Sequence, residues 1–363
     1  MTVAESENLR RRLAELPDPH TGTSLGETDA LRGVGVDGDR AAIEIRLGYP
    51  ARSWHAELAA QVRAAATSVP GIREATVTVE SKVAAHRVQK DLGPLPEVKN
   101  IIAVASGKGG VGKSTTAVNL ALALQAEGAT VGILDADIYG PSIPAMLGLQ
   151  GRPESPDGKT IEPKRGHGLQ AMSIGLLIDQ DTPMIWRGPM VTQALQQLLN
   201  DTRWQGLDYL VIDLPPGTGD IQLTLAQRVP VSGAVIVTTP QDIATLDARK
   251  ALQMFARVEV PVLGIVENMA VHVCSNCGHA EHVFGAGGGE RMAAQYGVPL
   301  LGSLPLDIRI REMADAGAPT VAAAPDSDPA RAYLAIARRT AARLALQARN
   351  RRIAFPNIVV QNT

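Results

Sequence analysis

The stretch Ile101-Ile-Ala-Val-Ala-Ser-Gly-Lys-Gly-Gly-Val-Gly-Lys-Ser-Thr-Thr116 decides the fold of this chain. It begins with five apolar residues, which is typical of a buried parallel strand, and then enters a glycine-rich turn. An apolar run over Ala117–Ala126 follows and reads as a helix. A strand, a glycine loop and a helix are the context in which the spacing Gly107-x4-Gly112-Lys113-Ser114 predicts a phosphate-binding loop.

The loop has residues suited to a nucleotide triphosphate and Mg²⁺. Glycines let backbone N–H groups converge on phosphate oxygens, and the following helix N-terminus adds partial positive charge. Lys113 supplies a charge for the β- and γ-phosphates, and the Ser114 hydroxyl is placed to ligate Mg²⁺. The residues expected to bind ATP here are Gly107, Lys108, Gly109, Gly110, Val111, Gly112, Lys113, Ser114 and Thr115.

Lys108 distinguishes this loop from an ordinary phosphate loop, because it places a second lysine early in the motif. Taken alone, it reads as a solvated loop charge. The whole string, however, resembles the deviant Walker A motif of the MinD/ParA/NifH-type ATPases. The resemblance implies that Lys108 reaches across a dimer interface to the partner's nucleotide as a catalytic residue. It also implies a slow ATP hydrolase whose nucleotide state is coupled to dimerisation.

Composition excludes several classes of function. A length of 363 residues suggests two or three domains, and a net charge of −2 gives no electrostatic case for binding nucleic acid. Only 3% of residues are aromatic, too few to predict a stacking platform for single strands. No apolar run approaches the roughly 18 residues that span a bilayer, and the N-terminus is Glu/Arg-rich rather than signal-like. We therefore expect a cytoplasmic protein without a membrane partner.

Residues 1–85 are predicted to form a small α+β domain. Its expected elements are a helix over Glu5–Leu16, a strand over Ala41–Gly48, a helix over Trp54–Thr67 capped by Ser53, and a strand over Ile72–Val79. The pattern resembles the metal–sulfur cluster assembly domain family, many members of which have a cysteine before the helix. Residues 48–53 contain no cysteine, so a partner-binding, regulatory or structural role is expected instead of metal chemistry.

Residues 86–99 read as a linker, and residues 100–325 alternate strand-like with helical segments. This alternation predicts an α/β domain with a mostly parallel, doubly wound sheet. The strands expected are Ile101–Ala105, Thr130–Leu134, Tyr209–Ile212, Gly233–Thr238, Val262–Val266 and Leu300–Gly302. Residues 326–363 are expected to form a C-terminal helix over Asp328–Arg349 and a tail. Leu334, Ile336 and Leu344 should pack on the core and leave the arginines of this helix solvated.

Carboxylates end two of the predicted strands. Asp135 and Asp137 follow one strand, and Asp213 ends another in the string Asp208-Tyr-Leu-Val-Ile-Asp-Leu-Pro-Pro-Gly217. The carboxyl ends of parallel strands face the ligand crevice, where Asp213 would hold Mg²⁺ and the aspartate pair would orient the attacking water. The two segments resemble switch I and switch II of the deviant Walker family. That resemblance implies that Asp137 is the catalytic aspartate.

Asn268 follows a further apolar strand. Its side-chain amide can both donate to and accept from an adenine edge, although a turn asparagine would be the simpler interpretation. With the family resemblance, Asn268 becomes a candidate for base recognition.

The two cysteines of the chain lie in one motif, Cys274-Ser-Asn-Cys277. Two thiolates at this spacing suit a tetrahedral metal, but zinc or an iron–sulfur cluster usually needs four ligands. His272, His279 or His282 could complete a zinc site, and a redox disulfide is another possibility. Alternatively, a symmetric dimer could bind one bridging [4Fe-4S] cluster with two cysteines from each chain.

The combined motifs resemble the Mrp/ApbC family of iron–sulfur cluster carrier proteins. The matching strings are Gly107–Ser114, Asp135–Ser142, Ile185–Met190, Asp213–Asp220, and Cys274–Cys277 followed by Phe284-Gly285 and three glycines. The resemblance implies a homodimer in which Cys274 and Cys277 bind a transferable cluster destined for recipient apoproteins. ATP binding or hydrolysis would govern loading or delivery. Two other functions stay open from the residues, a partition or positioning ATPase and a zinc-binding P-loop scaffold.

Overall fold

Eight strands form the central sheet of the molecule, for which this computed structural model describes residues 3–89, 92–178 and 188–347. They are β6 (Val98–Ser106), β7 (Val131–Asp135), β8 (Lys164–Gly166), β9 (Leu169–Ser173), β10 (Leu207–Asp213), β11 (Gly233–Thr238), β12 (Val262–Glu267) and β15 (Leu300–Ser303). Their order is β15-β12-β11-β6-β10-β7-β9-β8, and every pair is parallel except β8 with β9.

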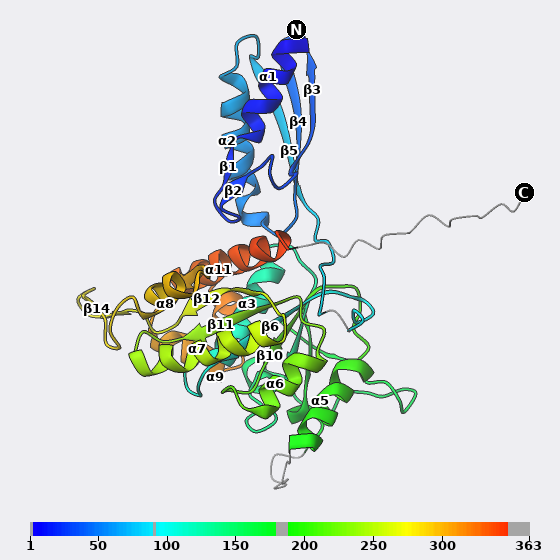
Figure 1. The fold of residues 1–363 in the computed structure, drawn as a ribbon, viewed down its shortest axis with the longest axis vertical. Helices are drawn as coiled ribbons and strands as arrows, with labels where there is room; N and C mark the ends of the chain where they lie inside the picture. Colours follow the sequence, from blue (N-terminus) through cyan, green and yellow to red (C-terminus); the bar gives the residue numbers. More distant parts are fainter. Residues whose placement is uncertain (1–2, 90–91, 179–187, 348–363) are drawn as a thin grey trace, which may run out of the picture.

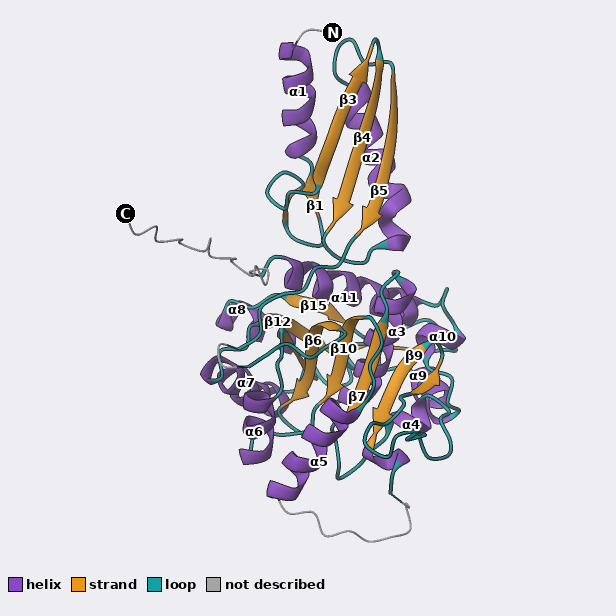
Figure 2. Cartoon of the chain, turned by 90° about the vertical axis from the view of Figure 1, so that its right-hand side faces the viewer, coloured by secondary structure: helices purple, strands orange, loops and turns teal. Residues whose placement is uncertain are grey.

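Helices cover both faces of this sheet (Figures 1 and 2). They are α3 (Lys113–Ala126), α4 (Ile143–Met146), α5 (Gly188–Asp201), α6 (Asp220–Arg228), α7 (Asp242–Arg257), α8 (Gly288–Tyr296), α9 (Ile308–Asp315), α10 (Thr320–Ala323) and α11 (Asp328–Ala345). Helices α3 and α11 share one apolar core with the sheet, while α5 to α8 pack into a second core on the opposite face. The predicted doubly wound, mostly parallel sheet is confirmed.

The six strands expected in the sheet all occur, with ends that differ by three residues or fewer. Most of them are buried apolar runs, as expected for a parallel sheet covered on both faces, but β15 at the sheet edge is only partly buried. Strands β8 and β9 form a hairpin at the sheet edge that the sequence pattern did not predict.

The N-terminal part of the chain builds a separate three-stranded sheet in the order β3-β4-β5. Its elements are α1 (Val3–Ala14), β1 (Pro17–Asp18), β2 (Thr23–Ser24), β3 (Leu31–Asp37), β4 (Arg40–Leu47), α2 (His55–Thr67) and β5 (Glu74–Ser81). Strands β3 and β4 are antiparallel, and β4 and β5 are parallel. The predicted α+β character is confirmed, although β3 was not predicted because its glycines are atypical of strands.

The N-terminal unit rests on the C-terminal end of helix α3. The Glu127 carboxylate there is fully buried and accepts hydrogen bonds from the Ser53 N–H (2.9 Å), the Ser53 hydroxyl (2.6 Å) and the Arg338 guanidinium (2.6 Å). Ser53 lies in a short 3₁₀ turn over Arg52–Trp54 and makes no capping bond to α2. The predicted helix cap is therefore wrong, because Ser53 bonds to Glu127 instead.

Helix α11 packs on α3 and on the sheet through buried Ile336 and Leu344 and partly buried Leu334. The prediction that its arginines form a solvated face is wrong for Arg338, whereas Arg339 is exposed as expected. Arg338 pairs with Glu127, and Arg339 donates to the carbonyl of Leu301 at 2.9 Å. The predicted tail over residues 351–363 lies outside the described residues. Across the described ranges, no helix combines the length and apolar character needed to cross a membrane.

Strand register brings the predicted carboxylates to one edge of the sheet. Asp213 of β10 lies directly opposite Asp135 of β7 on one side and Val104 of β6 on the other. Strand β6 leads into the glycine loop and α3, so the loop and both aspartates meet at the carboxyl ends of three adjacent strands. A short hairpin of β13 (His272–Val273) and β14 (Ala280–Glu281) projects from the side of the molecule (Figure 1).

Candidate nucleotide site and cysteine hairpin

The glycines of the loop are required by close contacts and by backbone conformation. A Cβ atom on Gly107 would lie 2.1 Å from the backbone of Asp247, so the loop lies directly against helix α7. Gly112 has a φ of 79° and immediately precedes α3. Since other residues rarely adopt this left-handed conformation, the chain turns into the helix here only with glycine.

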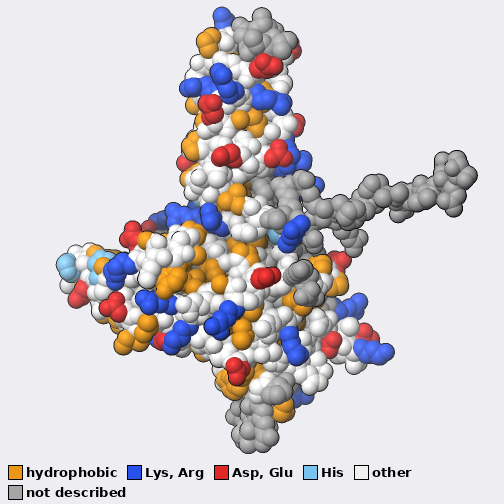
Figure 3. Space-filling view, viewed as in Figure 1, with side chains coloured by type: hydrophobic (Ala, Val, Ile, Leu, Met, Phe, Trp, Pro, Cys, Tyr) orange, Lys and Arg blue, Asp and Glu red, His pale blue; other side chains and the backbone are white. Residues whose placement is uncertain are grey.

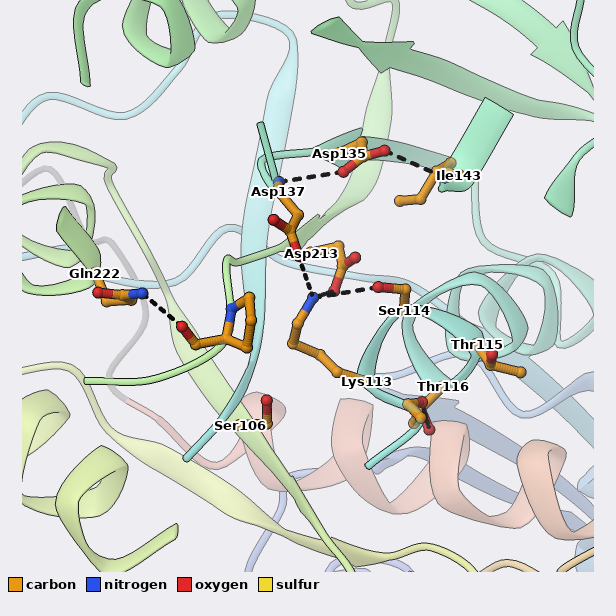
Figure 4. Close-up of polar contacts among 12 residues, drawn as sticks. Ser106, Lys113, Ser114, Thr115, Thr116, Asp135, Asp137, Ile143, Asp213 and Gln222 are labelled. Carbon is orange, nitrogen blue, oxygen red and sulfur yellow. Dashed lines mark hydrogen bonds and ion pairs between the residues drawn. The ribbon is translucent and has the colours of Figure 1, made fainter. Parts of the chain in front are cut away.

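Lys113 lies among carboxylates rather than in solvent (Figure 4). It is only 6% exposed, and its Nζ is 2.5 Å from Asp213 Oδ1, 3.2 Å from Ser114 Oγ and 3.9 Å from Asp137 Oδ2. The structure thus brings together four of the predicted site residues: Lys113 and Ser114 of α3, Asp213 of β10, and Asp137 from the segment after β7.

Asp213 is fully buried, and burial raises the pKa of its carboxyl group, while the Lys113 ammonium opposes this rise. Its Oδ1 binds Lys113, but its Oδ2 is buried without a hydrogen-bond partner in the described part of the chain. An oxygen in this state has a free ligand position, and the Ser114 hydroxyl belongs to the same cluster. Oxygen ligands are what Mg²⁺ prefers, so this pair fits the ion.

Asp135 and Asp137 have different environments. Asp135 is fully buried and accepts from the Asp137 N–H (3.1 Å), the Ile143 N–H (3.2 Å) and the Ser173 hydroxyl (3.1 Å). Burial and the nearby Asp213 raise its pKa to about 7. Asp137 is partly exposed, and burial raises its pKa while Lys113 lowers it. Asp135 therefore holds the loop in place, and Asp137 faces the site.

Two adjoining cavities lie along the glycine loop. One of about 260 Å³ is lined by the loop together with Asp137, Ser142 and Pro216. The second, of about 550 Å³, is lined by the loop, Asn268, Met269, Leu306 and Tyr333. The first has the polar lining that phosphates need, and the second has the size and mixed lining of a nucleoside site. Asn268 is thus placed at the second cavity, as base recognition requires.

Lys108 lines the smaller cavity and is partly exposed. Its carbonyl accepts from the Ser106 hydroxyl at 2.8 Å, which fixes the backbone of the loop here. Within the described ranges its ammonium makes no ion pair. The side chain is therefore available to a ligand or to a second chain.

The two cysteines lie in the projecting hairpin. Both are free, Cys277 is exposed and Cys274 partly so. The backbone closes a tight loop, because the Cys274 N–H donates to His279 O and the Gly278 N–H donates to Cys274 O, each at 2.9 Å. Hydrogen bonds from the N–H groups of Cys277 and Asn276 lower the pKa of the Cys274 thiol, which favours the thiolate that binds metals.

Two histidines near the cysteines each have a ring nitrogen within hydrogen-bond distance of a backbone carbonyl. Nδ1 of His272 lies 3.0 Å from Leu306 O, and Nδ1 of His282 lies 2.7 Å from Ala270 O. Histidine side chains gather at the end of the molecule where the hairpin projects (Figure 3). Over the described ranges, no group of three or more His, Cys, Asp or Glu side chains is arranged to hold a metal ion.

Sequence reasoning did not assign roles to several residues that the structure places at the site. Ser142, Met146, Pro216 and Leu306 line the cavities. Ser142 and Pro216 stand inside the strings that carried the prediction, so their position beside Asp137 and Asp213 was the available signal. The Ile185–Arg187 part of another string lies outside the described residues.

Comparison with protein families gives two matches. A family model described as NUBPL iron-transfer P-loop NTPase matches residues 97–341. A second model, described as iron-sulfur cluster assembly protein, matches residues 6–79.

Several characterised proteins are similar over most of their length. An iron-sulfur cluster carrier protein of Escherichia coli strain K12 is 53% identical over 333 residues, covering 92% of this chain and 90% of its own. One of Pseudomonas fragi is 61% identical over 275 residues, covering 75% and 96%. The iron-sulfur cluster transfer protein NUBPL of Mus musculus is 52% identical over 253 residues, covering 69% and 79%.

Among solved structures, a nucleotide-binding protein of Archaeoglobus fulgidus in complex with ADP has a TM-score of 0.55 and 40% identity. The match covers 61% of this chain and 87% of that one.

Proposed function

The chain belongs to the family of NUBPL iron-transfer P-loop NTPases, and from that premise we propose that it is an ATP-dependent carrier of iron–sulfur clusters. The cluster is its cargo, held by Cys274 and Cys277 and passed to recipient apoproteins. The observation that carries this proposal is the pairing of a complete phosphate site with two free cysteines on a projecting hairpin.

Each chain supplies half of the ligands that a cluster needs. A [4Fe-4S] cluster is usually held by four thiolates, and the whole chain contains two cysteines. A second copy related by a two-fold axis would supply the other two, because such an axis brings identical loops together. The free ammonium of Lys108 supports the same arrangement, since a second chain could place its phosphates within reach.

The residues of the nucleotide site divide the work of hydrolysis. The N–H groups of the loop and Lys113 bind the phosphates, and Asp137 orients the attacking water. Ser114 and Asp213 would hold Mg²⁺, which when bound neutralises charge on the β- and γ-phosphate oxygens. Before nucleotide binds, Lys113 compensates the charge of the buried Asp213 carboxylate beside the phosphate cavity. Slow ATP hydrolysis suits a carrier in which the bound nucleotide distinguishes the cluster-loaded form from the unloaded form.

Residues 1–85 form a partner-binding or regulatory domain in this proposal, joined through residues 86–99 to the ATPase domain over 100–325 and the C-terminal segment over 326–363. In this proposal the protein works in the cytoplasm, where thiols such as those of Cys274 and Cys277 would stay reduced.

Anaerobic reconstitution with iron and sulfide tests the cargo assignment. We expect wild-type protein to bind about four irons and four sulfides per two chains, as one four-thiolate cluster requires. The variant Cys274→Ala/Cys277→Ala should bind none. Iron and sulfide content that is equal in the two proteins would refute the assignment.

A further inference from the structure

Two consecutive residues at the end of strand β12 contact two different functional segments. Glu267 and Asn268 are both buried, with 4% and 8% of their surface exposed. Asn268 contacts the glycine loop, and Glu267 contacts the segment that closes the cysteine hairpin.

The Asn268 side chain is fitted against the glycine loop. Its Nδ2 donates to the carbonyl of Val111 at 2.9 Å. A Cβ atom on Gly112 would come within 2.2 Å of the same Nδ2. The backbone N–H of Asn268 donates to Thr238 O at 2.7 Å, so the residue is also bonded to the end of strand β11. A shift of the loop on phosphate binding would therefore act directly on Asn268.

The Glu267 side chain holds the start of helix α8, which follows the cysteine hairpin. Its Oε1 accepts the N–H of Gly289 at 2.7 Å. A Cβ atom on Gly289 would be 2.9 Å from the Glu267 Cβ, so only glycine permits this approach. The end of the hairpin segment is thereby tied to β12.

The beginning of the hairpin is tied to the wall of the nucleoside cavity. Ala270 N–H donates to Leu304 O at 2.9 Å, and Leu306 N–H donates to Val271 O at 2.8 Å. His272 Nδ1 lies 3.0 Å from Leu306 O. Leu306 lines the cavity together with Asn268 and Met269. Both ends of the cysteine segment are thus attached to structure that borders the nucleotide site.

We propose that Glu267 and Asn268 are positioning residues that transmit the state of the glycine loop to the cysteine hairpin. A displacement of Asn268 moves the adjoining Glu267 because the two share a peptide bond, and Glu267 carries Gly289 with it. A role of this connection in cluster delivery rests on the proposed function. The connection between the glycine loop and the cysteine hairpin does not depend on it. Nucleotide binding then changes how Cys274 and Cys277 are presented even when no cluster is bound.

Alkylation of the two thiols in cluster-free, reduced protein tests the link. The rate of reaction with iodoacetamide is measured for wild type with and without saturating Mg-ADP, whose binding is followed by calorimetry. We expect the two rates to differ by about five-fold or more, the usual scale of coupling between two sites. Glu267→Ala removes the acceptor for Gly289 N–H, so its two rates should become equal while ADP still binds.

Glu267→Gln is the matched control, because its side-chain oxygen can still accept from Gly289 and should preserve the ADP response. A Glu267→Ala protein that binds ADP and keeps the wild-type response would overturn the proposal. If Glu267→Ala does not fold, hydrogen exchange of wild-type residues 270–289 replaces it, and exchange unaltered by ADP contradicts the link. Failure of cluster reconstitution would instead refute the proposed function and leave these results standing.

Discussion

The positive charge of the Lys113 ammonium balances the negative charges of the neighbouring carboxylates in the site. Two carboxylates lie within 3.9 Å of it, and one of them, Asp213, has no exposed surface. Leaving a buried carboxylate without its cation is strongly destabilising. In the proposed mechanism, a phosphate that draws Lys113 away leaves Asp213 in need of another cation, and Mg²⁺ would take that place.

Asp137 should matter for turnover more than for binding. Asp137→Asn removes the carboxylate that orients water, and we expect kcat for ATP hydrolysis to fall about 100-fold or more. ATP affinity should not weaken, because the change removes a negative charge near the phosphates. Phosphate release and calorimetry measure the two quantities. Asp157→Asn, in an exposed turn, is the control, and wild-type kcat in Asp137→Asn would exclude the catalytic role.

Asp135 should make stability depend on pH. Its pKa rises from 3.8 to about 7 on folding, because the carboxyl group is buried beside Asp213. The folded state thus binds more protons than the unfolded chain between these values. This contribution to stability is complete below pH 3.8 and is lost as pH rises through about 7.

Asp135→Asn mimics the protonated form at every pH. The difference in Tm, variant minus wild type, should therefore become more positive between pH 5 and pH 8.5, as measured by thermal unfolding. A difference that stays constant over this range would show that Asp135 does not titrate in this way.

Sequence alone predicted the members of the site but not their contacts. Gly107, Lys113 and Asp213 follow from spacing, because strand, loop and helix fix where such residues lie. The opposite placement of Asp135 and Asp213 depends on strand order in the sheet, which a linear pattern does not specify. The hydrogen bond from Asn268 to Val111 joins residues 157 positions apart in the sequence, and the glycine-loop motif does not indicate it.

At the scale of elements, helix α3 joins two distant features. Its first turn contains Lys113 and Ser114, and its C-terminal cap is Glu127, which binds the N-terminal unit through Ser53. Helix α11 completes this contact with Arg338. Helix α3 thus connects the nucleotide site with the contact to the N-terminal domain.

The Glu127–Arg338 pair should contribute strongly to stability. Glu127→Ala leaves Arg338 in a largely buried position without its carboxylate, and removing one partner of a buried pair costs about 3–5 kcal/mol. The free energy of unfolding, obtained with urea, should fall accordingly.

Glu74→Ala is the matched control for Glu127→Ala, because its pair with Arg40 is exposed and should contribute at most about 1 kcal/mol. Equal losses in the two variants would mean that the Glu127 contact does not join the two units.

Helices and strands were predicted well, because their signal lies in neighbouring residues. Contacts between residues that are distant in the sequence were predicted poorly. Strands such as Gly233–Thr238 are uniformly apolar because both of their faces are buried, and their bounds agree with the prediction. Ser53 was assigned to a helix cap because that role needs only neighbours in sequence. Its true partner, Glu127, lies 74 residues away. The prediction of a solvated Arg338 in α11 was wrong for the same reason, because its partner is also Glu127.

At the scale of the whole molecule, two folded units and a projecting hairpin are compatible with the proposed dimeric carrier. The sheet presents the nucleotide site at one edge, and the hairpin places Cys274 and Cys277 at the surface, where a second chain or a recipient can reach them. The fold class followed from alternation of strands and helices. The packing of the N-terminal unit on α3 did not, because it depends on single polar contacts.

Cluster transfer tests the central claim most directly. Reconstituted protein is mixed anaerobically with apo-aconitase, which is active only with a [4Fe-4S] cluster, and recovery of aconitase activity is followed with and without Mg-ATP. The account predicts that recovery requires Cys274 and Cys277 and that its rate changes with ATP in wild type but not in Lys113→Ala. Equal recovery from Cys274→Ala/Cys277→Ala protein, or a rate indifferent to ATP in wild type, would contradict it.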